Sequence, residues 1–232
     1  ALLEPFDRLE NIGLTGAKLI NWNGSLQEAG GIYWKDGSAW NFGRNQAPRA
    51  PQFSYLKDVD YVSGAAICMP LKVWEEMNGF DPLFAPAYCE DSDLAFRLRA
   101  AGYRTLLAPE AEVIHHEGRS HGRDVESGIK AYQITNTKRL FERWRDVLER
   151  DHYPNGHNVL CARDRSFAKK HILVVDHYVP QWDQDAGSRS TFNCVEAFLK
   201  LGYSVTLWPD NLWRDPDYTP LYQAMGVEVV YG

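Results

Sequence analysis

The sequence lacks the marks of a disulfide-stabilised, zinc-binding or membrane-spanning protein. Its four cysteines are scattered over 232 residues and form no C-x-x-C pair, which argues against a zinc ribbon and a disulfide framework and fits a reducing compartment. No apolar run reaches the roughly 18–20 residues that a membrane helix needs, and the N-terminus has no charged-then-apolar signal pattern. We therefore expect no transmembrane segment and a cytoplasmic location, with peripheral attachment to a membrane left open.

Positive charge is also scarce. The chain has 25 Lys and Arg against 31 Asp and Glu, a formal net charge of −6. Affinity for nucleic acid depends mainly on cationic side chains that neutralise phosphates, so this balance argues against a nucleic-acid partner. The length and the 44% hydrophobic content are sufficient for one large or two small domains with cores of their own.

The hydrophobic pattern predicts an α/β protein in two parts, residues 1–150 and 169–232, joined by a linker at 151–168. The linker is inferred from a Pro-Asn-Gly turn signal and a charged stretch. In the first part we expect a short N-terminal helix and then, in chain order, a strand at 12–20, a hairpin turning at Asp36-Gly37, a buried strand at 58–69, helices at 71–77 and 92–101, strands at 104–108 and 111–114, and a long helix at 125–150.

The long helix should bury one apolar stripe. Its members, at helical spacing, are Ile129, Tyr132, Leu140, Phe141, Trp144 and Leu148. In the second part, strands at 170–176 and 203–208 flank a helix at 188–201, and a helix at 220–225 and a strand at 227–231 follow. Strand, helix and strand at this spacing predict a βαβ unit with a parallel sheet.

The densest polar segment is Tyr88-Cys-Glu-Asp-Ser-Asp93, at the predicted start of the helix over 92–101. The helix dipole favours negative charge at this end, so a carboxylate here can stay ionised and face the space before the helix. Acids in a first turn are also common as helix caps. Both interpretations, an active carboxylate and a cap, are open at this point.

A second polar segment follows the next predicted strand, in Ile114-His-His-Glu-Gly118 and the basic residues after it. Imidazoles at a strand end are good metal ligands, and arginines suit a diphosphate. Taken alone, two adjacent histidines are more often ordinary surface or packed residues than ligands.

These segments, in this order, closely resemble the C-terminal half of inverting family 2 glycosyltransferases with the GT-A fold. The runs that carry the resemblance are Val59–Ala66, Gly79–Phe84, Ala87–Arg97, Ala101–Tyr103 and Val113–Gly118, with Leu26–Gly31 and Asp36–Ser38 upstream. The resemblance covers residues 1–150. It implies the C-terminal half of a GT-A nucleotide-diphospho-sugar transferase fold, followed here by an incomplete Rossmann-like βαβ unit.

The resemblance also implies roles for particular residues. Asp91 corresponds to the catalytic base, with Glu90 supporting the site or the acceptor. A divalent metal, Mn²⁺ or Mg²⁺, would be held by His115, with His116 as the alternative. The substrates would lie against two short segments: Ser63, Gly64 and Ala65 beside the acceptor sugar, and Arg119, Ser120 and Arg123 at the diphosphate.

Several features depart from the family pattern. The nucleotide-binding half and its Asp-x-Asp motif should precede Ala1, so we expect a piece of a longer protein that is inactive alone. The Asp-x-Asp triplets at 58–60, 91–93, 183–185 and 215–217 do not stand where the family has its metal motif, and we discount them. The Gln-x-x-Arg-Trp motif of processive synthases is missing, which favours single addition.

Residues 169–232 resemble the opening of a family 4, GT-B type glycosyltransferase, through a β-run, Asp183–Ser188 and a helix. A plain βα turn is the alternative. The two resemblances together indicate a tandem glycosyltransferase. An incomplete parallel sheet has an exposed edge, so we also expect this chain to self-associate.

The expected function is transfer of a sugar from a nucleotide-sugar donor to a glycan or lipid-linked acceptor, with inversion. The alternative is a non-catalytic carbohydrate-binding or assembly module that keeps the fold. A receiver-like or Rossmann regulatory domain centred on Asp176 is a third interpretation. The donor sugar, its nucleotide and the acceptor are left open.

Overall fold

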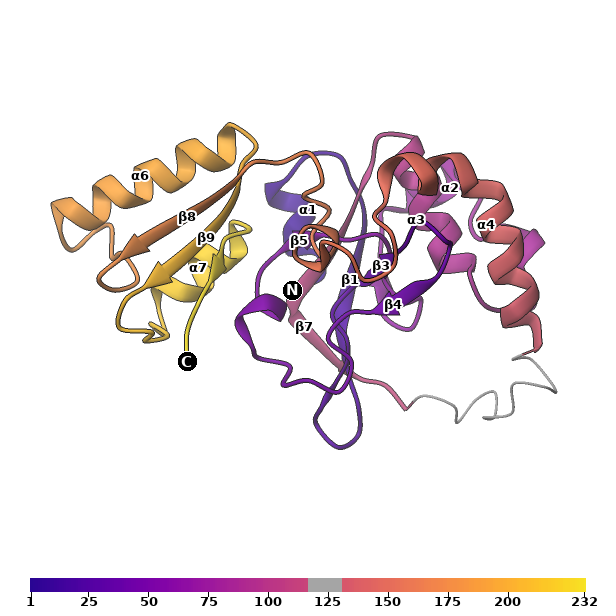
Figure 1. Ribbon diagram of the computed structural model, residues 1–232, viewed down its shortest axis with the longest axis horizontal. Helices are drawn as coiled ribbons and strands as arrows, with labels where there is room; N and C mark the ends of the chain where they lie inside the picture. The colour runs from indigo at the N-terminus through magenta and orange to yellow at the C-terminus, as the bar shows by residue number, and fades with distance from the viewer. Residues whose placement is uncertain (117–130) are drawn as a thin grey trace. The chain divides into compact units, whose positions relative to one another are not determined.

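The computed structural model describes residues 1–116 and 131–232. It divides the chain into two compact units (Figure 1). Unit 1 comprises residues 1–48 and 58–167, and unit 2 comprises residues 49–57 and 168–232. Both units combine helices with β-strands, so the chain is an α/β protein, as the sequence predicts.

The sheet of unit 1 is built around β1 (Ile12–Ile20), which is buried along its whole length. β1 pairs in parallel with β7 (Arg104–Ile114) and antiparallel with β2 (Leu26–Glu28) and β6 (Ile67–Cys68). With β5 (Lys57–Asp58) beyond β7, the path through the sheet is β2-β1-β7-β5. A nearly continuous apolar run is typical of a strand with neighbours on both sides and both faces covered.

The expected hairpin is confirmed as β3 (Gly31–Tyr33) and β4 (Ala39–Asn41), which pair antiparallel around the Asp36-Gly37 turn. Gly37 has a φ of 78°, a conformation that glycine adopts without the steric cost of a Cβ atom. Behind the hairpin, Trp34 is fully buried. The hairpin thus contributes directly to the core of unit 1.

The helices of unit 1 confirm the expected N-terminal helix, the helices at 71–77 and 92–101 and the described part of the helix at 125–150, and they include one helix, Val159–Ala162, that was not expected. They are α1 (Glu4–Arg8), α2 (Leu71–Glu76), α3 (Glu90–Ala100), α4 (Ala131–Asp151) and α5 (Val159–Ala162), with 3-10 turns at Pro51–Phe53 in unit 2 and Pro82–Phe84 in unit 1. No helix within residues 1–116 and 131–232 is both long and apolar enough to cross a membrane.

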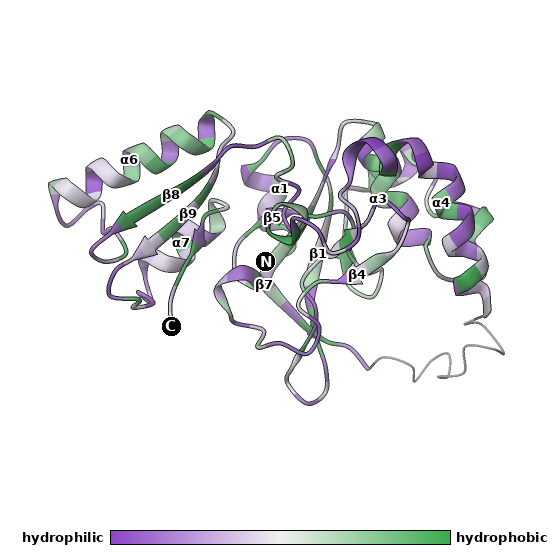
Figure 2. Cartoon of the chain, viewed as in Figure 1, coloured by the Kyte–Doolittle hydropathy of each residue, from purple (hydrophilic) through white to green (hydrophobic). Residues whose placement is uncertain are grey.

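Helices α3 and α4 pack against each other through aromatic contacts. Phe96 of α3 stacks on Trp144 of α4 with ring centroids 5.3 Å apart, and Leu140 and Leu148 of α4 are fully buried. Figure 2 shows α4 alternating between hydrophilic and hydrophobic residues along its length. The expected apolar stripe is therefore correct at these positions, but Tyr132 is exposed. Ile129 lies outside the described residues.

The expected continuous strand over 58–69 is wrong. The structure has only the short strands β5 and β6 at its two ends. Between them, the Asp60 carboxylate is fully buried and accepts a hydrogen bond from the Tyr33 amide at 2.8 Å, and a turn follows at Ser63–Gly64. A buried carboxylate needs hydrogen-bond and charge partners, and the local chain follows those partners rather than a regular ladder.

The two strands expected at 104–108 and 111–114 form one strand, β7. Its register against β1 shifts between the pairs Ala17–Ala108 and Lys18–Glu112. Pro109 lies between Ala108 and Glu112, among residues of β7 that have no partner in β1. Proline has no backbone N–H, so its presence at an unpaired position removes no hydrogen bond between the strands. The strand therefore continues through the proline by means of an irregularity.

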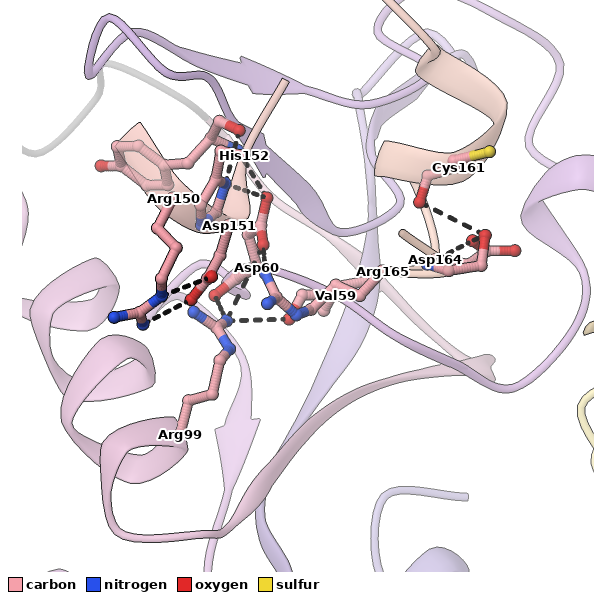
Figure 3. Close-up of polar contacts among 11 residues, drawn as sticks. Val59, Asp60, Arg99, Arg150, Asp151, His152, Cys161, Asp164 and Arg165 are labelled. Carbon is pink, nitrogen blue, oxygen red and sulfur yellow. Dashed lines mark hydrogen bonds and ion pairs between the residues drawn. The ribbon is translucent and has the colours of Figure 1, made fainter. Parts of the chain in front are cut away.

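Residues 151–167, expected as most of a linker, are folded into unit 1. His152, Ser166 and Arg163 are buried. Figure 3 shows Arg165 from this segment and Arg99 from α3 both directed at Asp60. Chain-local turn signals led to the linker prediction, whereas buried polar contacts with distant residues determine the fold of this segment.

Unit 2 contains the expected βαβ arrangement. β8 (His171–Asp176), α6 (Ala186–Lys200) and β9 (Ser204–Pro209) are followed by α7 (Tyr218–Ala224) and β10 (Glu228–Val229). The strands are parallel in the order β10-β9-β8. Val195, Leu207 and Tyr222 lie in its core. The segment at 49–57 joins this unit, where the Leu56 amide donates to the Gln223 carbonyl at 2.9 Å.

Candidate functional site

The acidic segment begins α3 from a strained backbone. Tyr88 and Cys89 have φ values of 74° and 71°, which are uncommon for residues other than glycine. Asn136 of α4 holds this approach in place: its Nδ2 donates to the carbonyls of Phe84 and Ala87 at 2.8 Å and to that of Tyr88 at 3.1 Å. Strained backbone of this kind persists only where the surroundings fix it, and it is common at functional sites.

The half-buried carboxylate of Asp91 contacts both its own helix end and a distant turn. Its Oδ2 accepts the Gly64 amide at 2.9 Å, and its Oδ1 accepts the Ser92 amide at 2.7 Å. Burial raises the pKa of Asp91, and these two amides oppose that rise. The residue at the N-cap position is Cys89, whose side chain makes no capping hydrogen bond. Asp91 thus satisfies one amide in the first turn of its own helix and also contacts a distant turn, so it is more than a helix cap.

The Ser63–Gly64 turn is held by a second carboxyl group that sequence reasoning missed. The Ser63 amide donates to Glu28 Oε1 at 3.1 Å, and Glu28 is only 3% exposed. Burial and, to a smaller extent, the negative charge of Asp91 raise the pKa of Glu28 to about 8. The hydrogen bond from the Ser63 amide and the positive charge of Arg44 act in the opposite direction and lower this pKa. Glu28 lies in the run Leu26–Gly31 that carries the family resemblance, and this was the available signal.

Glu90 adds a third carboxyl group, next to Asp91 along the chain. It is half-buried, and burial raises its pKa, with the charge of Asp91 acting in the same direction. Among the described residues, the buried Glu90 Oε2 has no hydrogen-bond partner. A buried acceptor atom without a partner carries a desolvation cost, which a ligand hydroxyl could offset.

Two glycines allow the strands beside the site to approach closely. A Cβ atom on Gly31 would lie 1.8 Å from the Tyr61 ring, and one on Gly30 would lie 2.5 Å from Val59. Gly64 differs, because a Cβ there would meet Asp91 at 3.6 Å, an ordinary contact distance. Gly64 is therefore not required by packing within the chain.

Asp93, the last acid of the segment, is structural. It is fully buried, accepts Arg97 Nε at 2.7 Å and Trp144 Nε1 at 2.9 Å, and lies 3.3 Å from Arg143. These contacts join α3 to α4. The three neighbouring acids therefore divide by environment: Asp91 contacts the turn, Glu90 has a buried oxygen without a partner among the described residues, and Asp93 lies in the helix interface.

The other Asp-x-Asp triplets also have structural contacts. Asp58 forms a two-point ion pair with Arg104, with both distances 2.9 Å. Asp185 caps α6 by accepting the Ser188 amide at 2.7 Å, and Asp215 accepts the Tyr218 amide at 2.8 Å. One carboxylate of each of these triplets thus has a structural partner.

The two histidines proposed as metal ligands differ in their surroundings. His115 is half-buried and His116 is exposed. His115 Nδ1 lies 3.1 Å from Gln27 Oε1. Since an amide oxygen only accepts, Nδ1 carries the hydrogen and the Nε2 lone pair is left for a metal. Within residues 1–116 and 131–232, no three His, Cys, Asp or Glu side chains gather as a metal site. The described residues fit one ligand, not a full set. Arg119, Ser120 and Arg123 lie outside the described residues.

A buried charge cluster lies next to the turn along the chain. Asp60 pairs with Arg165, accepts Tyr33 N–H, and has Arg99 Nη2 bonded to its carbonyl at 2.6 Å. His152 Nδ1 donates to the Tyr33 carbonyl at 2.9 Å. These contacts fix the backbone at Asp60, only a few residues before Ser63 along the chain (Figure 3).

Comparison with known proteins shows which family the chain resembles. The model of a family described as glycosyltransferase like family 2 matches residues 23–138, which include the turn, Glu28 and Asp91. N-acetylglucosaminyl-diphospho-decaprenol L-rhamnosyltransferase of Mycobacterium tuberculosis, strains CDC 1551 / Oshkosh and ATCC 25618 / H37Rv, is 30% identical over 165 residues, 64% of this chain and 53% of the relative. O-antigen biosynthesis protein RfbC of Myxococcus xanthus is 30% identical over 160 residues, 66% of this chain and 12% of that protein.

This chain spans about half the length of the rhamnosyltransferases that it matches. The family model, in contrast, covers half of the 232 residues of this chain, including the proposed catalytic segment. The chain therefore belongs to the glycosyltransferase-like family 2.

Proposed function

We propose that the protein transfers a sugar from a nucleotide-sugar donor to a glycan or lipid-linked acceptor, with inversion at the anomeric carbon. The observation that carries the proposal is the placement of Asp91: a half-buried carboxylate at the start of α3, bonded to the Gly64 amide 2.9 Å away. Family membership supports sugar transfer as the reaction class.

In the proposed reaction, Asp91 takes the proton of the acceptor hydroxyl while the hydroxyl oxygen attacks the anomeric carbon. The bond from that carbon to the nucleoside diphosphate breaks on the opposite face, so the configuration inverts. Burial raises the pKa of Asp91, which makes its carboxylate a stronger base than a solvated aspartate. Hydrogen bonds from the Gly64 and Ser92 amides act in the opposite direction and favour its ionised form.

The acceptor side is assigned to the turn and to Glu90. Ser63, Gly64 and Ala65 lie directly before β6 at the Asp91 carboxylate, and a small-residue turn lets a sugar approach the backbone. Glu90 Oε2, buried and without a partner among the described residues, would accept a hydrogen bond from an acceptor hydroxyl. This bond would fix the orientation of the acceptor relative to Asp91.

The donor side rests on fewer described residues. His115, with Nε2 left open by the Gln27 contact, would supply one ligand to Mn²⁺ or Mg²⁺, and His116 is the alternative. Bound there, the metal would neutralise charge on the leaving diphosphate. Arg119, Ser120 and Arg123 are proposed to contact the same diphosphate.

The names of the relatives narrow the choice of donor and acceptor. Two of them are rhamnosyltransferases that act on a diphospho-decaprenol acceptor, and a third is an O-antigen biosynthesis protein. We therefore favour a deoxyhexose donor and a lipid-diphosphate-linked acceptor in polysaccharide biosynthesis, which would bring the protein to a membrane surface. Unit 2, with its parallel βαβ arrangement, is proposed to begin a second, family 4 glycosyltransferase domain.

The alternative is a carbohydrate-binding or assembly module without turnover. Both proposals predict binding of sugars, but only the transferase predicts a catalytic role for Asp91.

The deciding experiment is calorimetric titration with UDP-, GDP- and dTDP-sugars, with and without Mn²⁺, on this chain and on an N-terminally extended form, followed by transfer assays. Metal-dependent binding and transfer that Asp91→Asn reduces at least about a hundredfold would support the transferase. Asp146→Asn is the matched control, because Asp146 is exposed on α4. The transferase proposal would be overturned if transfer persisted in Asp91→Asn, or if the protein bound glycans without any turnover.

A further inference from the structure

Two carboxyl groups from distant elements hold adjacent amides of one turn. Glu28, the last residue of β2, accepts the Ser63 amide at 3.1 Å, and Asp91, in the first turn of α3, accepts the Gly64 amide at 2.9 Å. Two consecutive amides on one turn cannot move independently. The contact at Ser63 therefore constrains where the Gly64 amide points, and with it the Asp91 carboxylate.

The surroundings of Glu28 favour its neutral form. The titratable and charged groups that act on it are Asp91, Arg44 and Tyr61. Burial and Asp91 outweigh Arg44 and the Ser63 amide, and the pKa of Glu28 rises to about 8. Two ionised carboxylates sharing one turn would repel each other, and a shared site normally keeps one of them protonated. A neutral Glu28 still accepts the Ser63 amide and leaves Asp91 as the ionised partner.

We propose that Glu28 is a positioning residue of the transfer site, which sets the Ser63–Gly64 turn and thereby the orientation of the Asp91 carboxylate. This inference rests on the proposed function for its catalytic consequence, but not for its structural one. Glu28 acts through the turn and does not itself exchange a proton with the acceptor.

The proposal separates three substitutions at one position. Glu28→Gln keeps the shape, the neutral charge and an oxygen that accepts the Ser63 amide, so the turn should stay in place. Glu28→Ala removes that acceptor. Glu28→Asp withdraws the carboxyl by one methylene and serves as a milder second variant if Glu28→Ala folds poorly.

The first test is amide hydrogen exchange at Ser63 and Gly64 in this chain, which needs no catalytic activity. We expect exchange at both amides to accelerate about tenfold in Glu28→Ala, to accelerate less in Glu28→Asp, and to stay close to wild type in Glu28→Gln. Glu110→Ala is the control, since Glu110 is exposed. Unchanged exchange at both amides in Glu28→Ala and Glu28→Asp would overturn the proposal.

The second test is infrared difference spectroscopy of wild type against Glu28→Gln, below and above the Glu28 pKa of about 8. A protonated carboxyl band that is present below this pH and missing from Glu28→Gln supports a neutral Glu28. Its absence from wild type would show an ionised Glu28 and overturn the assignment of Glu28 as the neutral partner of Asp91.

The third test follows transfer in the extended form. Glu28→Ala should lower kcat about tenfold or more with KM for the donor unchanged, and Glu28→Gln should retain most of kcat. If Asp91→Asn leaves transfer intact, the proposed function fails, while the exchange and infrared results still decide the role of Glu28. If Asp91→Asn abolishes transfer and Glu28→Ala does not alter kcat, the positioning role alone is wrong.

Discussion

At the scale of single residues, the site depends on how buried polar groups find partners. Asp60, Glu28 and Asp93 are all buried, yet they meet different surroundings: arginines for Asp60 and Asp93, and an amide beside another carboxylate for Glu28. A buried charge persists only when such partners offset its desolvation. Buried acidic side chains therefore stabilise the fold at Asp60 and Asp93 and shape the site at Glu28.

His152 should make stability depend on pH. Burial lowers the pKa of its imidazole from 6.5 to about 4 in the folded chain, so the unfolded chain binds the proton more tightly. Stability is then fully present above pH 6.5 and falls as the pH drops through this interval toward about 4, by roughly 3 kcal/mol.

The measurement is the free energy of unfolding in urea between these pH values for wild type and His152→Gln. The variant should lose the acid-side slope that His152 causes. His157→Gln, at an exposed position, should retain it. An equal slope in wild type and His152→Gln would show that the imidazole does not carry the effect.

Two glycines near the site should differ in how much an added methyl group lowers the free energy of unfolding. Gly31→Ala would place a Cβ 1.8 Å from the Tyr61 ring, and we expect a loss of about 1–3 kcal/mol in unfolding free energy. Gly64→Ala meets only an ordinary contact with Asp91 and should leave stability within about 0.5 kcal/mol.

If the turn lies beside the acceptor, Gly64→Ala should weaken acceptor binding all the same. Thermal unfolding and acceptor titration of both variants check this pair. A Gly64→Ala variant with unchanged stability and unchanged acceptor affinity would remove Gly64 from the acceptor site.

At the scale of elements, α4 acts as the support of the loop that precedes α3. Its buried Asn136 donates to three carbonyls in residues 84–88, and its Trp144 reaches Asp93. The backbone at Tyr88 and Cys89 is in a left-handed conformation. The element that positions the catalytic segment thus comes from well outside that segment.

Asn136→Ala should therefore loosen the loop before α3. The substitution leaves three carbonyls without their side-chain donor, which we expect to cost about 1–3 kcal/mol. Hydrogen exchange at the amides of residues 84–91 should accelerate more than exchange in β1. Gln133→Ala, on an exposed position of the same helix, is the control. Uniform acceleration across the sheet would indicate general destabilisation and contradict a specific supporting role.

At the scale of the whole chain, the structure comprises two units with separate cores. In unit 2, β8 stands at the end of the strand order found among the described residues. Leu173, Val175 and Trp208 are 59%, 64% and 43% exposed. In a parallel pair, residues in register share a face, and Val175 pairs with Trp208. An apolar face beside a strand edge favours association with another chain.

We accordingly predict that this chain self-associates. Light scattering should give a mass that rises with concentration, and Val175→Lys should lower that mass toward the monomer by placing a charge on the exposed face. Lys200→Glu, on the exposed surface of α6, is the control. A monodisperse monomer at all concentrations would count against the prediction.

The sequence by itself determined the order and kind of most elements, because helical and strand periodicity and glycine or proline signals are local. The first α/β part, the βαβ arrangement of unit 2 and the position of Asp91 at the start of a helix all follow from such patterns. The family also follows from the sequence, as the model match over residues 23–138 shows.

Only the tertiary structure decided which groups meet. The expected strand at 58–69 is interrupted around Asp60, and residues 151–167 belong to unit 1. Glu28 and Asp91 accept hydrogen bonds from adjacent amides of one turn. These outcomes depend on the cost of burying charge, which is offset by partners many residues away along the chain. Local periodicity contains no information about such partners, so no reading of the pattern alone could assign them.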